Sequence, residues 1–170
     1  MQKFVKKAGL WHWMLALCCV VALGSCKDGY EDPFDAVAQA KWEDDVIKQY
    51  LEVNKITDYT RTSTGLYYVK REEGTGAKPV AGQTVEVNYV GKTVLESYKF
   101  DSSYDRAQTF KFTLGQRRVI LGWEEGIPLM RKGEKALLLI PSHLAYGRTG
   151  SGNIQPNVPI MFDIHLIDFN

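Results

Sequence analysis

The chain has 170 residues, 45% hydrophobic and 24% charged, which suits one globular domain with additional segments and excludes a chain disordered throughout. Its 21 basic and 20 acidic residues leave a formal charge of +1, and no basic region of the kind that binds nucleic acid is present. No internal repeat or low-complexity segment interrupts it.

The N-terminal segment has the pattern of a targeting signal. Three lysines within the first seven residues precede an apolar run, 8–25, interrupted only by His12 and Ser25. The run ends in Leu23-Gly24-Ser25-Cys26, which resembles a bacterial lipobox. We therefore expect 1–25 to be a signal peptide and Cys26 to carry lipid, with an uncleaved anchor helix as the alternative. Either predicts a membrane-tethered protein of the bacterial envelope, in the periplasm or at the cell surface.

Cleavage before Cys26 would leave 145 residues with a formal charge of −2, because the three lysines are removed. Cys18 and Cys19 would leave with the signal, so no thiol would remain for a disulfide or a metal site. The short polar segment 26–31 is expected to be a tether between lipid and domain.

An amphipathic helix is predicted next, within 32–58. Asp32 can cap it, Pro33 suits the first helical position, and Asp35 places negative charge in the first turn, so the helix is expected from Pro33 to about Asn54. Glu43 falls outside the predicted apolar stripe, which comprises Trp42, Val46, Ile47, Tyr50, Leu51 and Val53. Packing on the domain is favoured over a homodimer, because the helix is too short for a sustained heptad seam. The helix is also expected to be separable from activity.

From Thr60 onward, apolar residues recur with a period of two, as in half-buried antiparallel strands. Strands are predicted at 66–69, 84–90, 110–114, 136–140 and 160–167. One short helix, 121–127, lies between them and is bounded by Pro128. This order predicts an α+β domain over 60–170.

Several weaker patterns are better explained by structure than by chemistry. Gly147, Gly150 and Gly152 lack the lysine and helix of a phosphate-binding loop and are expected to be turn residues. Adjacent carboxylates on a helix point in different directions, so Glu124 and Glu125 are expected to lie on solvated surface. Neither His143 nor His165 has metal-ligand or triad spacing, and no metal is expected.

From Ala81 to Asn170, the chain resembles the FKBP family. Several motifs occur in order with nearly the right gaps, which is far more specific than any one alone. They are Val87-Asn88-Tyr89-Val90-Gly91, Lys99-Phe100-Asp101-Ser102-Ser103, Asp105-Arg106, Phe110-Lys111-Phe112, Val119-Ile120-Leu121-Gly122-Trp123-Glu124-Glu125-Gly126, Ala145-Tyr146-Gly147 and Met161-Phe162-Asp163.

The resemblance implies a five-stranded antiparallel sheet wrapped around the short helix, with a proline pocket between them. It implies catalytic roles for Tyr89, Asp101, Tyr146 and Phe162, with Tyr146 and the backbone N–H of Ile120 bonding substrate carbonyls. Trp123 would form the floor of the pocket, and Arg106 would hold Asp101 at its rim. The other expected wall and substrate-binding residues are Phe100, Phe110, Val119, Ile120 and Ile154.

The implied activity is cis/trans isomerisation of Xaa-Pro bonds in unfolded or nascent polypeptides, without a cofactor. Two segments beside the pocket depart from the family pattern, 91–100 by one extra residue and 146–162 by one fewer, which bears on sequence preference and on binding of macrolide inhibitors. A chaperone or assembly adaptor that uses the same cleft without useful turnover is the alternative, since fold alone does not establish activity.

Overall fold

The structure is a computed structural model and describes residues 34–170. The predicted signal peptide, Cys26 and the tether lie outside the described residues, as do Asp32 and Pro33. Residues Asp35–Asn170 form one compact unit, which includes the N-terminal helix. Within 34–170, no helix is long and apolar enough to cross a membrane.

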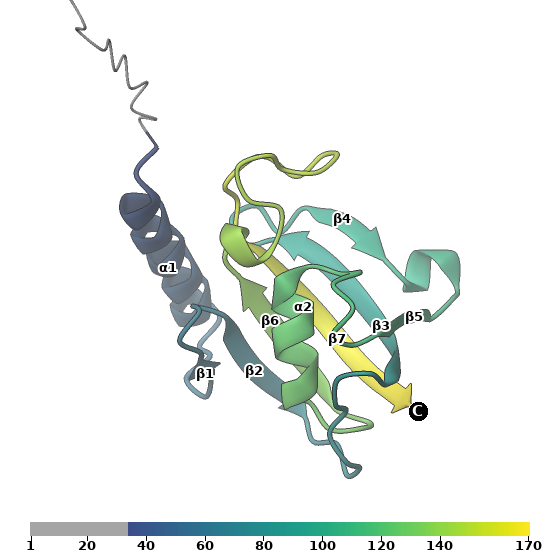
Figure 1. The fold of residues 1–170 in the computed structure, drawn as a ribbon. Helices are drawn as coiled ribbons and strands as arrows, with labels where there is room; N and C mark the ends of the chain where they lie inside the picture. Colours follow the sequence, from purple (N-terminus) through teal and green to yellow (C-terminus); the bar gives the residue numbers. More distant parts are fainter. Residues whose placement is uncertain (1–33) are drawn as a thin grey trace, which may run out of the picture. The chain divides into compact units, whose positions relative to one another are not determined.

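The described chain folds as an antiparallel sheet with a helix on each face (Figure 1). The sheet has the strand order β1-β2-β6-β7-β3-β4, and β5 pairs with β3. The α+β class is confirmed, with seven strands in place of the expected five. The elements are α1 (Ala36–Val53), β1 (Thr60–Arg61), β2 (Tyr67–Glu72), β3 (Thr84–Thr93), β4 (Lys99–Ser102), β5 (Phe110–Thr113), α2 (Leu121–Gly126), β6 (Lys135–Ile140) and β7 (Ile160–Phe169).

Tertiary pairing explains the strands that periodicity did not predict. β1 has only two residues, and β4 carries a lysine and an aspartate, so neither shows an alternating apolar pattern. β4 forms because Ser102 and Asp101 pair with Val90 and Gly91 of the long strand β3. In β3 the predicted alternation is confirmed, with Val85, Val87 and Tyr89 buried.

β6 is buried on both faces, which explains its nearly continuous apolar sequence. Leu138 and Ile140 pack toward α2, where a Cβ added at Gly126 or Gly122 would lie 2.5 Å from their side chains. These two glycines, four residues apart, therefore let α2 approach the sheet closely. Leu137 and Leu139 belong to a second apolar cluster on the opposite face, beneath α1.

The N-terminal helix begins later than its sequence indicated. Asp35 is the N-cap, and its Oδ1 accepts hydrogen bonds from the N–H groups of Val37 (2.9 Å) and Ala38 (3.0 Å). The expectation that Asp35 would lie within the first turn was wrong. An aspartate satisfies N–H groups left free at a helix start, so the helix begins at Ala36.

α1 packs within the chain, as favoured from the sequence, but through a rotated face. Ile47 and Leu51 are buried against the sheet, whereas Trp42 and Val53 are 43% and 73% exposed. Glu43, expected on another face, is only 1% exposed. The prediction for Glu43 was wrong because its carboxylate is buried by hydrogen bonding to the segment that follows β6.

Candidate active site

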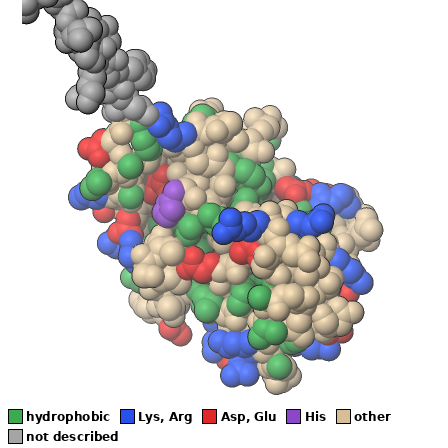
Figure 2. All heavy atoms as spheres, viewed as in Figure 1, with side chains coloured by type: hydrophobic (Ala, Val, Ile, Leu, Met, Phe, Trp, Pro, Cys, Tyr) green, Lys and Arg blue, Asp and Glu red, His purple; other side chains and the backbone are tan. Residues whose placement is uncertain are grey.

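A cavity of about 600 Å³ opens between α2 and the sheet, within the usual size range of small-molecule sites. Its lining comes from β3, β4, β5 and β7, from α2 and the loop before it, and from the segment between β6 and β7. On the face viewed in Figure 2, exposed hydrophobic side chains are bordered by basic and acidic ones. The lining residues are Tyr89, Asp101, Phe110, Arg117, Arg118, Val119, Ile120, Leu121, Trp123, Ala145, Tyr146 and Phe162.

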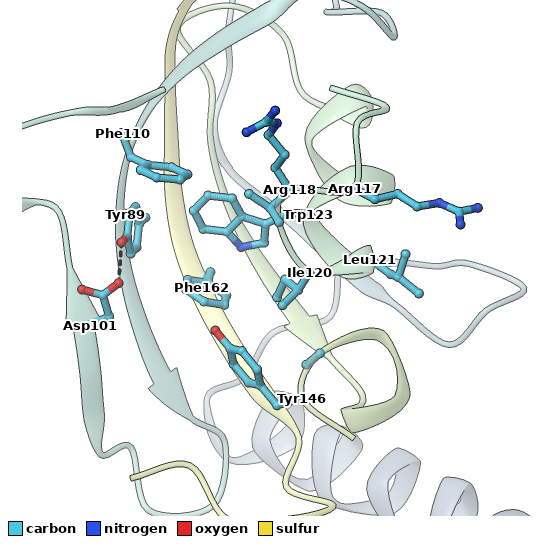
Figure 3. A pocket seen from close by; sticks show the side chains of 12 residues that line it. Tyr89, Asp101, Phe110, Arg117, Arg118, Ile120, Leu121, Trp123, Tyr146 and Phe162 are labelled. Carbon is cyan, nitrogen blue, oxygen red and sulfur yellow. Dashed lines mark hydrogen bonds between the residues drawn. The ribbon is translucent and has the colours of Figure 1, made fainter. Parts of the chain in front are cut away.

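Trp123 forms the centre of the aromatic part of this cavity (Figure 3). Its ring centroid lies 5.0 Å from those of Tyr89 and Phe162, in edge-to-face arrangements of 80° and 79°, and 6.0 Å from that of Phe110. Such arrangements are favourable because the positive edge of one ring meets the negative face of another. Four rings from four separate elements thus make a rigid apolar floor and wall.

One polar atom of this floor has no partner. The indole Nε1 of Trp123 is buried and makes no hydrogen bond within residues 34–170. A buried donor without an acceptor is unfavourable by about 1 to 3 kcal/mol. The cavity therefore contains a donor that a bound ligand could satisfy.

Asp101, Tyr89 and Arg106 form a hydrogen-bonded group at one side of the cavity. The Tyr89 hydroxyl donates to Oδ2 of Asp101 (2.5 Å), and Arg106 donates to Oδ1 of Asp101 (2.5 Å) and to the Tyr89 hydroxyl oxygen (2.7 Å). The predicted pairing of Asp101 with Arg106 is confirmed.

The protonation states of this group follow from its contacts. Burial opposes ionisation of Asp101, but the hydrogen bonds from Tyr89 and Arg106 outweigh it and lower the pKa of the carboxyl. Burial, reinforced by the hydrogen bond to Asp101, raises the pKa of Tyr89 to about 12. The site thus holds an ionised aspartate and a neutral tyrosine at neutral pH.

Tyr146 reaches the cavity from the segment between β6 and β7, and its hydroxyl points into it (Figure 3). Burial, and next the negative charge of Asp101, raise its pKa, so the phenol stays protonated. Neither this hydroxyl nor the backbone N–H of Ile120 has a hydrogen-bond partner in the described part of the chain. Two donors are therefore available at the edge of an apolar cavity.

Three residues expected at the site do not line the cavity. Phe100 packs edge-on against Phe162, with centroids 5.5 Å apart, and so supports the wall from behind. Ile154 belongs to the buried core and forms an isolated bridge with Ser151. Arg106 acts on the site through Asp101 and Tyr89.

Four lining residues were not predicted: Arg117, Arg118, Leu121 and Ala145. Leu121 and Ala145 belong to the motifs but were not assigned to the site, and Arg117 and Arg118 immediately precede the motif that begins at Val119. Arg117 has a left-handed backbone, with φ of 53°, which is uncommon outside glycine. Its N–H and that of Gly115 donate to the carboxylate of Glu124, at 2.7 and 2.6 Å.

Glu124 is therefore more than solvated helix surface, which corrects the sequence-based expectation. Glu125 likewise accepts a hydrogen bond from Thr64 (2.8 Å).

The three glycines Gly147, Gly150 and Gly152 all have positive φ, as expected for turn residues. His143 lies outside the cavity lining, with Nε2 3.0 Å from the carbonyl oxygen of Thr64. No group of side chains suited to a metal ion occurs within residues 34–170.

Comparison with known families assigns most of this domain to a single family. Residues 75–167 match the model of the family described as FKBP-type peptidyl-prolyl cis-trans isomerase. The chain is 39% identical over 145 residues to the FKBP-type peptidyl-prolyl cis-trans isomerase FkpA of Aeromonas hydrophila, covering 81% of this chain and 53% of that protein. It is 47% identical over 97 residues to peptidyl-prolyl cis-trans isomerase FKBP1A of Xenopus laevis, covering 56% and 89%.

A solved structure agrees with these matches. The crystal structure of FkpA from Escherichia coli superposes with a TM-score of 0.68 and 36% identity, covering 79% of this chain and 62% of that one. The matched part spans about half the length of the FkpA relatives.

Proposed function

Because this chain belongs to the FKBP-type peptidyl-prolyl cis-trans isomerase family, we propose that it accelerates rotation about Xaa-Pro bonds in other polypeptides. The observation that carries the proposal is an aromatic cavity centred on Trp123, with unpartnered donors at Tyr146 and Ile120 along its edge. This arrangement suits a proline ring in the cavity and peptide carbonyls at the edge.

The reaction needs little from side-chain chemistry. Rotation about the amide faces a barrier of about 18 to 20 kcal/mol, because resonance is lost at the twisted geometry. Uncatalysed exchange takes on the order of tens to hundreds of seconds, so about 100 turnovers per second need roughly 10⁴-fold acceleration, or about 5.5 kcal/mol. No bond is broken, and no nucleophile is required.

The cavity can contribute this acceleration by removing water. A planar amide carries separated charge that water stabilises, whereas the twisted amide is less polar. The rings of Trp123, Phe162 and Tyr89 would therefore disfavour the planar form relative to the twisted one. Tyr146 and the N–H of Ile120 would hold the flanking carbonyls in position without reorganising.

Proline-limited refolding of a test protein measures this activity directly. The full chain should shorten the slow phase, and the Trp123→Ala chain should shorten it much less after its folded fraction is checked. Binding of clients without a change in the slow phase would instead favour a chaperone or adaptor role for the same cleft. The exposed Leu121 at the cavity is compatible with client binding in either case.

The substrates proposed are proline-containing unfolded or nascent polypeptides. The name of FK506-binding protein 1 of Debaryomyces hansenii, 44% identical over 101 residues, states that it binds FK506. We propose that macrolides of this kind can also enter the cavity here. Inhibition of the refolding activity by FK506 would test it.

We also propose that Cys26 carries lipid and that the domain works in the cell envelope. The proposal depends on Leu23-Gly24-Ser25-Cys26 after a basic and apolar segment. Mass spectrometry of the membrane-extracted protein should find a diacylated N-terminus at Cys26. A chain that still begins at Met1 without modification would exclude the lipoprotein form.

A further inference from the structure

The carboxylate of Glu43 is buried beneath α1 and contacts the segment that carries Tyr146. Its Oε2 accepts a hydrogen bond from the N–H of Ser142 (2.6 Å), and its Oε1 accepts one from the hydroxyl of Ser142 (2.5 Å). Gln39, one helical turn earlier, donates a third through Nε2 (2.6 Å). Within residues 34–170, Glu43 forms no ion pair. These three hydrogen bonds therefore satisfy its buried carboxylate.

The same helix also holds the far end of this segment. Nε2 of Gln39 donates to the carbonyl oxygen of Asn157 (2.9 Å). Gln39 and Glu43 are four residues apart and therefore lie on one face of α1. We name Ser142 to Asn157 the pocket loop. Side chains of α1 form hydrogen bonds with it at both ends.

Hydrogen bonds inside the pocket loop lead from these two ends to Tyr146. The carbonyl oxygen of Ser142 accepts from the N–H groups of Ala145 and Gly147, each at 2.8 Å. Asn157 donates its N–H to the carbonyl oxygen of Gly147, also at 2.8 Å. Ser142 and Asn157, the two residues bonded to α1, therefore form hydrogen bonds directly with the residues that flank Tyr146.

The choice of a charged residue at this position is informative. An isolated buried carboxylate is unfavourable, and an apolar residue of similar volume often gives equal or greater stability. Stability alone therefore does not explain a glutamate here, whereas its two carboxylate oxygens accept from the two donors of Ser142 at the same time. α1 also precedes residues 75–167, so this contact comes from outside the matched family region.

We propose that Glu43, assisted by Gln39, is a positioning residue that fixes the pocket loop so that Tyr146 is held at the cavity. The inference rests on the proposed isomerase function. Glu43 does not touch the cavity and acts through Ser142. The helix is thereby part of the active-site support.

The test compares full-length Glu43→Ala, Glu43→Gln and Gln39→Ala with the wild-type chain. In Glu43→Ala we expect kcat/KM for proline-bond exchange to fall by about tenfold, because misplacing a substrate-binding group slows the reaction. Glu43→Gln should retain part of the activity, since its amide oxygen can still accept one bond from Ser142. Gln39→Ala removes the bonds to Asn157 and to Oε1 of Glu43 but leaves both bonds from Ser142 to Glu43, and it should lower kcat/KM by about threefold.

Amide hydrogen exchange measured by NMR separates positioning from general stability. In Glu43→Ala the amides of Ser142, Ala145 and Gly147 should exchange faster, while those of Leu138 and Ile164 in the sheet keep their protection. Glu52→Gln makes the matched substitution at an exposed position of α1 and should match the wild type in both measurements.

Wild-type kcat/KM in a folded Glu43→Ala chain would overturn the proposal. So would faster exchange spread evenly over loop and sheet, which indicates a role in stability alone. If Glu43→Ala does not fold, unchanged loop exchange and activity in Gln39→Ala would also overturn it. A wild-type chain without isomerase activity would refute the proposed function, whereas the loop amides would still show whether Glu43 fixes the loop.

Discussion

At the scale of single residues, the site combines rings that are held rigidly with donors that are left unpaired. Trp123, Tyr89 and Phe162 fix one another edge to face, whereas the hydroxyl of Tyr146 has no partner within residues 34–170. A hydroxyl without a protein partner can bond a ligand without breaking an intramolecular hydrogen bond. Its contribution should therefore appear in activity and not in stability.

Tyr146→Phe tests this separation. Loss of one hydrogen bond to a substrate carbonyl should lower kcat/KM by about fivefold, corresponding to about 1 kcal/mol. The midpoint of denaturant unfolding should stay that of the wild type, because no intramolecular bond is removed. Unchanged kcat/KM would mean that the hydroxyl does not contact the substrate.

The two arginines at the cavity are the other distinctive feature at this scale. Figure 3 shows Arg118 extending on the side of Phe110 and Arg117 on the side of Leu121. Neither forms an ion pair within residues 34–170, and the Arg118 Nε donates a hydrogen bond to Oε1 of Gln116, at 3.3 Å. The negative charge of Asp101, in contrast, is already neutralised by Arg106.

Peptides with glutamate beside the proline should consequently be better substrates than those with lysine. A charge near an exposed arginine is worth about 1 kcal/mol in water, so we expect about a fivefold difference in kcat/KM at low salt. Replacing both Arg117 and Arg118 by glutamine should abolish this difference, and 0.5 M salt should reduce it in the wild type. An undiminished preference in the double variant would assign it to other residues.

At the scale of elements, α1 belongs to the folded domain. Ile47 and Leu51 cover the face of the sheet formed by Tyr67, Leu137 and Leu139. Asp44 of α1 also accepts hydrogen bonds from the Tyr67 hydroxyl (2.7 Å) and from Nε of Arg61 (2.9 Å). This packing argues against the expectation that the helix is separable, and we propose that the domain begins at Asp35.

A chain truncated to begin near Thr60 should lose stability. Burying Ile47 and Leu51 contributes about 1.5 to 3 kcal/mol each, and truncation also leaves the sheet residues beneath them exposed. Denaturant unfolding should show a lower midpoint, together with a smaller m-value because less surface is buried. A truncated domain as stable as the full chain would show that the helix contributes nothing to the fold.

At the scale of the whole molecule, the proposed mechanism transfers no proton. The pKa of Asp101 lies below its usual 3.8, and those of Tyr89 and Tyr146 lie above their usual 10. Between these limits neither Asp101 nor the two tyrosines of the cavity change charge. The stability that ionised Asp101 contributes is present above its unfolded pKa and is lost only as the pH falls through its lowered folded pKa.

Isomerase activity should therefore be flat from about pH 6 to pH 9 and decline only in acid. Measuring kcat/KM across this range in both H₂O and D₂O should also give a solvent isotope effect near one. His143→Ala should behave like the wild type, because His143 lies outside the cavity lining. A step in the neutral range that disappears in His143→Ala would contradict the mechanism.

The local pattern of the sequence determined most of the elements, and the resemblance to the FKBP family implied the central site residues. Period-two alternation located β3 and β7, and the short helix lies in the predicted helical stretch before Pro128. Trp123, Tyr89, Tyr146, Phe162 and Asp101 were all identified from motif order, and all line the cavity. The elements are visible in the sequence because their periodicity depends on residues that are neighbours along the chain.

Only the tertiary structure decided which face of α1 is buried and which segments pack against one another. β4 exists because β3 provides a partner, and Ile154, expected in the wall of the pocket, is buried in the core. Glu43 appears solvent-facing in the helical pattern, yet it binds Ser142, 99 residues away. Periodicity cannot reveal a buried carboxylate, since its burial depends on donors supplied by a distant segment once the chain has folded.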